Sequence, residues 1–236
     1  MGRAFEYRRA SKEKRWDKMS KIFPKLARSI TMAVKAGGSD PGSNSSLRTA
    51  IQNAKAESMP KDNIDKAIKR AEGNDVEEWA EVNYEAKAGS GVLIFLETAT
   101  NNINRTVANL RAILNKNGGE MVPTGSLEFM FSRKTSIQFP VPEGMDMEEL
   151  ELELIDHGLE ELEVNEGTAY LQGDFTAFGP LTAAIEKMEI EGAKAKLERI
   201  PSSPVEITEA QMEEVEALID KLEDDEDVQS VFTNIA

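Results

Sequence analysis

The amino-acid sequence predicts an α+β protein: an N-terminal three-helix domain followed by two ferredoxin-like α/β-sandwich domains, with the third inserted into the second. Three observations support this fold class. Apolar residues recur at helical spacing through the first 71 residues, strand patterns begin after Gly73, and the segment 133–203 follows the order β-α-β-β-α-β. We therefore expect a helical domain at 1–74, a split domain at 75–132 plus 204–236, and an inserted domain at 133–203.

The first predicted helix has an apolar face and a basic face. Its apolar residues recur from Met19 to Val34 at steps of three and four, which places them on one side of a helix. Five basic residues fall on a separate arc: Lys18, Lys21, Lys25, Arg28 and Lys35. Pro24 leaves two alternatives, a helix kinked at the proline or a helix that begins between Ser20 and Pro24.

Two shorter helices follow a turn. The sequence GGSDPGSN, residues 37–44, ends the first helix and reverses the chain. The next helices are expected at 45–57 and 59–71, with Ser58 as the cap of the latter and Pro60 in its first turn.

The split domain begins with a hairpin. Strands are expected at 81–87 and 91–98, joined through Gly89-Ser90, and a helix at 104–117 ends at Gly118. The alternation of Leu127, Phe129 and Phe131 predicts a third strand.

The remaining elements complete both sheets. In the inserted segment we expect a strand around 137–141, a helix at 147–154, strands at 159–164 and 168–172, a helix at 181–188 and a strand at 195–200. A helix at 212–222 and a strand at 228–234 then complete the interrupted domain.

Charge is distributed very unevenly along this chain of net charge −15. Residues 1–74 carry 17 Lys and Arg against 8 Asp and Glu, whereas residues 75–236 carry 11 against 35. Such asymmetry indicates a nucleic-acid contact by the basic part. Two alternatives remain: the basic residues form a solvated face, or they dock on the acidic remainder of the chain.

Several motifs resemble the YebC family, whose mitochondrial relatives are translational activators of cytochrome oxidase. They are the segment 21–71 from KIFPKLARS to IDKAIKRA, then EVNYEAKAGSGV, TNNINRT, KNGGEMVPTGSLEFMF and LEDDEDVQSVFTNI, in this order over nearly the whole chain. The resemblance implies three domains and a non-enzymatic, nucleic-acid-associated role in gene expression. Bacterial members are described as DNA-binding transcriptional regulators, and others act on translation at the ribosome.

The basic side chains of the first domain are the predicted nucleic-acid-binding residues, because Lys and Arg neutralise phosphates. The first group is Arg8, Arg9, Lys12, Lys14, Arg15, Lys18, Lys21, Lys25 and Arg28, and the second is Arg48, Lys61, Lys69 and Arg70. Trp16 could stack on an unpaired base, although a core position is the more common role for such a residue.

A polar cluster at a helix start is a candidate anion or partner site. It consists of Asn101, Asn102, Asn104, Arg105 and Thr106. Helix capping explains one or two of the asparagines, and the surplus amides with Arg105 could hold a phosphate or an acidic group. The glycines of KNGG and PTGS are expected to serve backbone geometry.

Enzymatic chemistry has little support in the sequence. There is no cysteine, and the single histidine, His157, precedes Gly158 at a helix end, where capping is expected. We expect no metal and no cofactor, and LEDDEDV lacks the glycine and spacing of a calcium loop, so a solvated turn is expected there.

These observations predict a cytoplasmic, monomeric regulator that binds nucleic acid. The longest apolar run, Val92 to Leu96, is far shorter than a membrane helix, and no secretory signal pattern is visible. Structured RNA at the ribosome is the favoured target, since no recognition helix or dimerisation element is evident. DNA-directed transcriptional control is a close alternative, and a protein-interaction scaffold is a third.

Overall fold

The computed structural model describes residues 15–73 and 78–236, with side chains from residue 20 onward. Its contacts divide the chain into two compact units. The first combines residues up to Lys25 with Glu77–Ser132 and Arg199–Ala236, and the second combines Leu26–Val76 with Arg133–Glu198. The α+β fold class is confirmed, whereas the division into three domains stays a prediction. No helix in the described ranges has both the length and the apolar character needed to cross a membrane.

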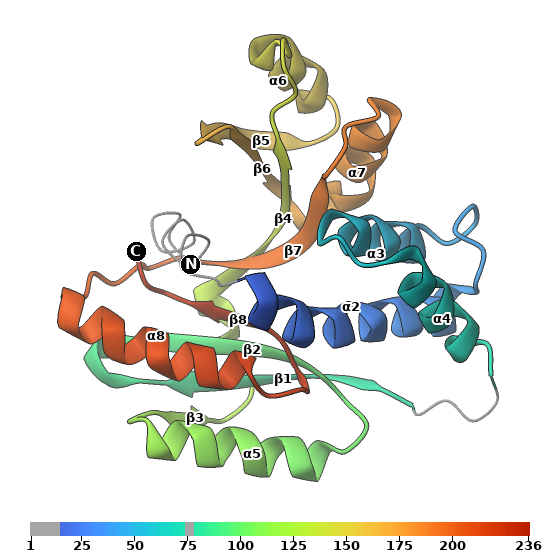
Figure 1. Cartoon of the computed structure of the whole chain (residues 1–236). Coiled ribbons are helices and arrows are strands. Elements are labelled where there is room, and N and C mark those ends of the chain that lie inside the picture. The colour runs from blue at the N-terminus through green and yellow to red at the C-terminus, as the bar shows by residue number, and fades with distance from the viewer. Residues whose placement is uncertain (1–14, 74–77) are drawn as a thin grey trace. The chain divides into compact units, whose positions relative to one another are not determined.

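Within residues 15–73 the structure has three helices: α2 (Arg15–Gly37), α3 (Ser45–Ala56) and α4 (Lys61–Ala71) (Figure 1). The alternative in which the first helix begins at Ser20 to Pro24 is wrong. Helix α2 runs through Pro24, whose ring is exposed, so the missing N–H leaves no buried group unpaired.

The turn after α2 is held by one buried amide. The Asn44 side chain donates to the carbonyl oxygens of Ala33 and Gly38, at 2.8 Å each, and accepts the N–H of Leu47 at 3.0 Å. Asn44 thereby caps α3 and joins its start to the end of α2.

The predicted cap of α4 is wrong. Pro60, which makes no side-chain cap bond, is the residue before α4, and Ser58 instead adopts a φ of 61°. The N–H groups of Ser58 and Met59 bond to Lys55 and Ala54, so this stretch ends α3 rather than starting α4.

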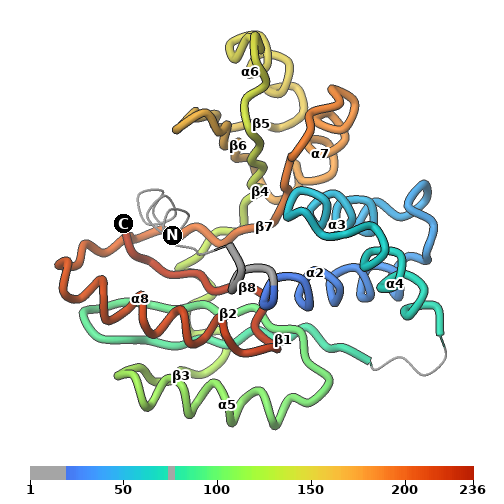
Figure 2. The backbone as a smooth tube through the Cα atoms, in the orientation of Figure 1, coloured from blue at the N-terminus to red at the C-terminus, as the bar shows by residue number. Residues whose placement is uncertain are grey.

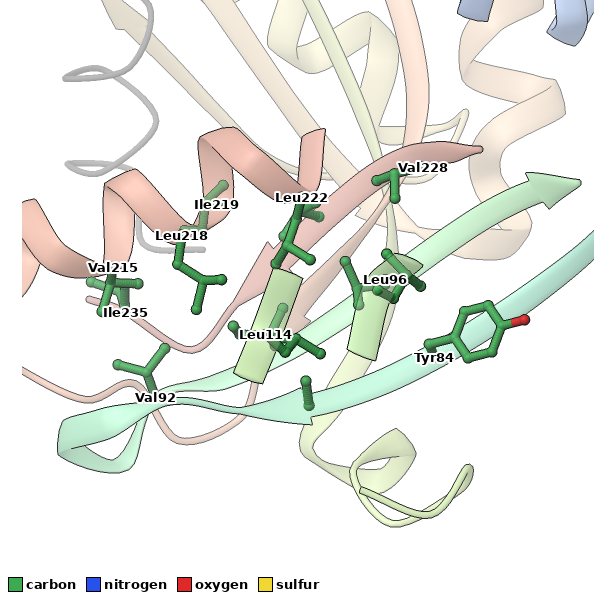
Figure 3. Close-up of a cluster of buried hydrophobic side chains, with 14 residues drawn as sticks. Tyr84, Val92, Leu96, Leu114, Val215, Leu218, Ile219, Leu222, Val228 and Ile235 are labelled. Atoms are coloured by element: carbon green, nitrogen blue, oxygen red, sulfur yellow. The ribbon is translucent and has the colours of Figure 1, made fainter. Parts of the chain in front are cut away.

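The first unit contains a four-stranded sheet in the order β3-β1-β2-β8. All of its pairings are antiparallel. The strands are β1 (Ala80–Lys87), β2 (Leu93–Thr100), β3 (Glu120–Val122) and β8 (Val228–Thr233). Helices α5 (Ile103–Lys116) and α8 (Glu209–Glu223) pack on one face of the sheet. Figure 3 shows Leu114 of α5 and Leu218 and Leu222 of α8 in the same buried cluster as Leu96 of β2.

The prediction of the third strand from Leu127, Phe129 and Phe131 is wrong. The strand lies at Glu120–Val122, and the residues expected to form it instead include a short helical turn, Glu128–Met130. The buried carboxylate of Glu85 explains the difference, because it accepts the N–H groups of Gly125 and Leu127 and curls the chain there. Phe129 consequently lies 78% exposed.

The second unit contains a sheet in the order β5-β6-β4-β7, with the predicted β-α-β-β-α-β connectivity. The elements are β4 (Phe131–Pro140), α6 (Met147–Ile155), β5 (Leu159–Asn165), β6 (Thr168–Asp174), a 3-10 turn (Phe175–Ala177), α7 (Phe178–Lys187) and β7 (Lys194–Pro201). Its core includes Ile137 and Leu171 of the sheet and Leu154 and Leu181 of the two helices.

Helix α3 caps the edge of this sheet within the same unit. The Asn53 side chain donates to the Ala195 carbonyl at 2.7 Å and accepts the Ala195 N–H at 2.8 Å. Because β7 is the last strand in the order, this amide takes the place of one residue of a neighbouring strand. An ion pair between Lys194 and Glu57, at 2.6 Å, adds to the contact.

Candidate nucleic-acid interface

Helix α4 has three exposed basic side chains, one at its first residue and two in its last turn. It buries Ile64, Ala67 and Ala71 on one side and leaves Lys61, Lys69 and Arg70 exposed. These three cations make no salt bridge with another residue of the described ranges. Lys69 and Arg70 lie in the last turn, where the helix dipole also favours positive charge. Three cations in this state are available to neutralise phosphates.

Two predicted phosphate-binding lysines of α2 contact the acidic end of α8. The Lys21 ammonium lies 2.5 Å from Asp224 Oδ1, and the Lys25 ammonium donates to the Glu223 carbonyl at 2.7 Å. Lys21 and Lys25 therefore contact the acidic part of the chain, as one of the alternatives to nucleic-acid binding predicted.

Arg48 serves the internal structure of its unit. Its guanidinium donates to the carbonyl oxygens of Pro41 and Gly42 and lies 3.3 Å from Glu186. Arg48 therefore joins the loop before α3 to α7. Arg28 is half-buried on α2.

The remaining predicted contacts cannot be placed. Arg8, Arg9, Lys12 and Lys14 lie outside the described residues, and Arg15 and Lys18 belong to α2 with side chains outside them. The same holds for the side chain of Trp16. A nucleic-acid role for these residues stays a prediction.

The polar cluster at the start of α5 is organised around a carboxylate of the chain itself. Arg105 Nη2 lies 2.9 Å from both oxygens of Asp227 and 3.0 Å from Asn101 Oδ1. Asn102 caps the helix by accepting the Arg105 N–H, as capping predicts. Thr106 Oγ1 donates to Asp227 Oδ2 at 2.7 Å. Asp227 is thus an acceptor shared by Arg105 and Thr106, and the role of this cluster as an anion or partner site stays a prediction.

Burial and hydrogen bonding act in opposite directions on the charge of Asp227. Burial alone would raise its pKa, but the hydrogen bonds from Arg105, Thr106 and Thr100, together with the Arg105 charge, hold this pKa below its usual range. Asp227 in turn raises the pKa of Arg105. The pKa of Tyr84 is raised by burial and by the Asp227 charge. Asp227 is therefore a buried anion neutralised by an exposed arginine.

The prediction of a solvated turn at LEDDEDV is wrong for one of its five acidic residues. Asp224 and Glu226 are exposed, whereas Asp227 is 2% exposed. Sequence reasoning missed this role because nothing in a run of acids marks the one that turns inward. The surplus of donors around Arg105 was the available signal, since they require an acceptor.

The other groups considered for chemistry show no catalytic arrangement. His157 is exposed, and the glycine after it adopts a φ of 93° at the end of α6. In the described part of the chain, no group of three or more acidic or histidine side chains could hold a metal ion.

The fold and this interface define a class of protein: a predominantly acidic α+β chain with two four-stranded sheets and a basic helical N-terminal segment. Family models match over nearly the whole chain. Residues 3–74 match the TACO1/YebC N-terminal domain, and residues 79–235 match the TACO1/YebC second and third domains. The chain belongs to the TACO1/YebC family.

Relatives of known name agree with this membership. Proteins of Wolinella succinogenes and Sulfurimonas denitrificans, each named a "probable transcriptional regulatory protein", are 60% and 59% identical to this chain, over the full length of both sequences. The crystal structure of a conserved hypothetical protein from Aquifex aeolicus is similar with a TM-score of 0.82 and 33% identity. That match covers 94% of this chain and 92% of the other.

Proposed function

We propose that this protein is a non-enzymatic regulator of gene expression that binds nucleic acid through its first 74 residues. The observation that carries the proposal is the charge reversal between the two parts of the chain, +9 for residues 1–74 and −24 for the rest. Lys61, Lys69 and Arg70 present part of the positive charge on the surface of α4. Phosphate neutralisation by such side chains supplies sequence-independent affinity.

The acidic remainder orients the protein on its target. A segment with 35 acids against 11 bases is repelled by a phosphate backbone, so the basic helices face the nucleic acid. The same acidic surface favours a basic protein neighbour, and ribosomal proteins have that chemistry. This combination favours structured RNA at the ribosome and a role in translation.

DNA-directed transcriptional control is the second candidate. It is favoured by the printed names of the relatives in Wolinella and Sulfurimonas. A protein-interaction scaffold, the third candidate, predicts little nucleic-acid affinity. Under that candidate, charge reversal on the basic helices would weaken a protein complex whether or not nucleic acid is present.

Sedimentation of the native protein from cell lysate tests the proposal. The lysate is layered on sucrose gradients at low and high salt, with and without a nuclease that removes only DNA. Salt-sensitive migration with ribosomal particles that resists the nuclease is the expected result. Absence from those fractions, with recovery on DNA, would instead establish the transcriptional alternative, and recovery with neither would favour the scaffold.

A further inference from the structure

Two lysines of α2 and the end of α8 form a charged contact inside the first unit. Lys21 and Lys25 are one helical turn apart, so their side chains lie on the same face of α2. Lys21 pairs with the Asp224 carboxylate and Lys25 with the Glu223 carbonyl oxygen. Figure 2 shows the end of α8 beside the first part of α2 that is drawn in blue.

The end of α8 presents anionic oxygens as a phosphate backbone does. Glu223 is the last residue of the helix, so its carbonyl lies at the negative end of the helix dipole. Asp224, Asp225 and Glu226 follow directly and add three carboxylates. Cations that bind the oxygens of this helix end have the charge to bind phosphate oxygens as well.

We propose that the acidic end of α8 competes with nucleic acid for Lys21 and Lys25 and thereby lowers the affinity of the basic helices. The inference rests on the proposed function, because it concerns the regulation of the same surface. Nucleic acid must displace Asp224 before Lys21 can neutralise a phosphate. The protein therefore contains an internal competitor that moderates its sequence-independent binding.

The exposure of the ion pair sets the size of the effect. The side chains of Lys21 and Asp224 are 49% and 50% exposed, and exposed pairs are weak and screened by salt. The contact therefore moderates binding rather than blocking it. Removing the competing carboxylate should strengthen binding about two- to fivefold at low salt.

The first test compares two substitutions on or beside α8 that remove one negative charge each. Asp224→Asn removes the partner of Lys21, and Glu213→Gln removes an exposed carboxylate of the same helix that makes no described ion pair. Binding of the full chain to a fluorescent RNA hairpin is followed by anisotropy between about 50 and 200 mM salt. We expect Asp224→Asn to bind about two- to fivefold tighter than wild type and Glu213→Gln to bind within about 1.5-fold.

A double-mutant cycle isolates the competition from the general change in charge. Lys21→Met should weaken binding more in the Asp224→Asn background than in wild type, because the Asp224 carboxylate no longer competes with phosphate for Lys21 there. The plot of log affinity against log salt should also steepen by up to about 0.9 in Asp224→Asn, the contribution of one neutralised phosphate.

The outcomes separate this inference from the proposed function. If wild type binds the hairpin and Asp224→Asn behaves like Glu213→Gln, the competition is absent while nucleic-acid binding stands. An equal effect of Lys21→Met in both backgrounds would lead to the same conclusion. If none of the variants binds at low salt, the proposed function fails and the inference fails with it.

Discussion

At the scale of single residues, two buried carboxylates organise the local structure around them, and their burial is not evident from the composition of the chain. Asp227 stands in a run of acids, yet it alone of that run is both buried and bonded to Arg105. Glu85 is likewise buried and holds two backbone N–H groups of the loop that follows β3. A carboxylate in such a position is retained because the donors around it would otherwise be left unpaired.

Replacing the buried aspartate should destabilise the protein. Asp227→Asn leaves Arg105 without its ion-pair partner and faces an amide toward the donors of Thr106 and Thr100, so we expect the free energy of unfolding to fall by about 2 kcal/mol at neutral pH. Urea denaturation followed by circular dichroism measures the change. Asp220→Asn, at an exposed position of α8, serves as the comparison, and an equal loss there would contradict a special role for Asp227.

The same substitution should change the pH dependence of stability. Because folding lowers the pKa of Asp227, its contribution is complete above the ordinary aspartate pKa of about 3.9 and is lost as pH falls through the lower folded value. The difference in unfolding free energy between wild type and Asp227→Asn should therefore be constant near neutral pH and shrink in acid. A difference that grows on acidification would contradict this assignment.

Two glycines of the second unit provide a matched test of close packing. A Cβ on Gly173 would lie 2.4 Å from the carbonyl oxygen of Gly158, whereas a Cβ on Gly179 would meet nothing within 4 Å. We expect Gly173→Ala to lower the free energy of unfolding by about 2 kcal/mol or more. Gly179→Ala, in the first turn of α7, should be neutral or raise it by up to about 1 kcal/mol. Thermal denaturation of both variants decides between these outcomes.

At the scale of elements, periodicity predicted the type of most helices and strands because their buried faces repeat regularly. Helix α5 and the hairpin of β1 and β2 are confirmed near their expected bounds. The prediction of the third strand is wrong because the Glu85 side chain bonds to the loop at Gly125 and Leu127. These residues lie 40 and 42 positions from Glu85 in the sequence. Local patterns carry no information about such a distant partner.

The contact between α3 and β7 predicts a measurable role for one amide. Asn53→Ala removes both hydrogen bonds to Ala195, leaving an edge-strand N–H and C=O to water, and should lower the free energy of unfolding by about 1 to 2 kcal/mol. Gln52→Ala, the neighbouring position on α3, should change it by less than about 0.5 kcal/mol. Hydrogen exchange at the Ala195 amide gives a local readout, and unchanged protection in Asn53→Ala would contradict the capping role.

At the scale of the whole molecule, the sequence predicts which segment carries the candidate site, but it does not predict the contacts of each basic residue. Counting charges distinguishes residues 1–74 from the rest, since net charge needs no knowledge of contacts. It cannot show that Arg48 binds loop carbonyls, or that Lys21 and Lys25 bind the end of α8. Those assignments depend on which acceptors the fold brings near each cation.

The exposed cations of α4 support a prediction about affinity and its salt dependence. Lys69→Glu/Arg70→Glu should weaken binding to an RNA hairpin by at least roughly tenfold and make the slope of log affinity against log salt shallower by about 1.5, since about two phosphates lose their partners. The control, Arg111→Glu/Lys116→Glu, makes the same change in net charge at exposed positions of α5 and should alter affinity about twofold or less, with the slope unchanged. Equal losses of affinity in the two variants would mean that net charge alone governs binding. A local phosphate contact at α4, in contrast, predicts a larger loss of affinity for the α4 variant than for the α5 variant.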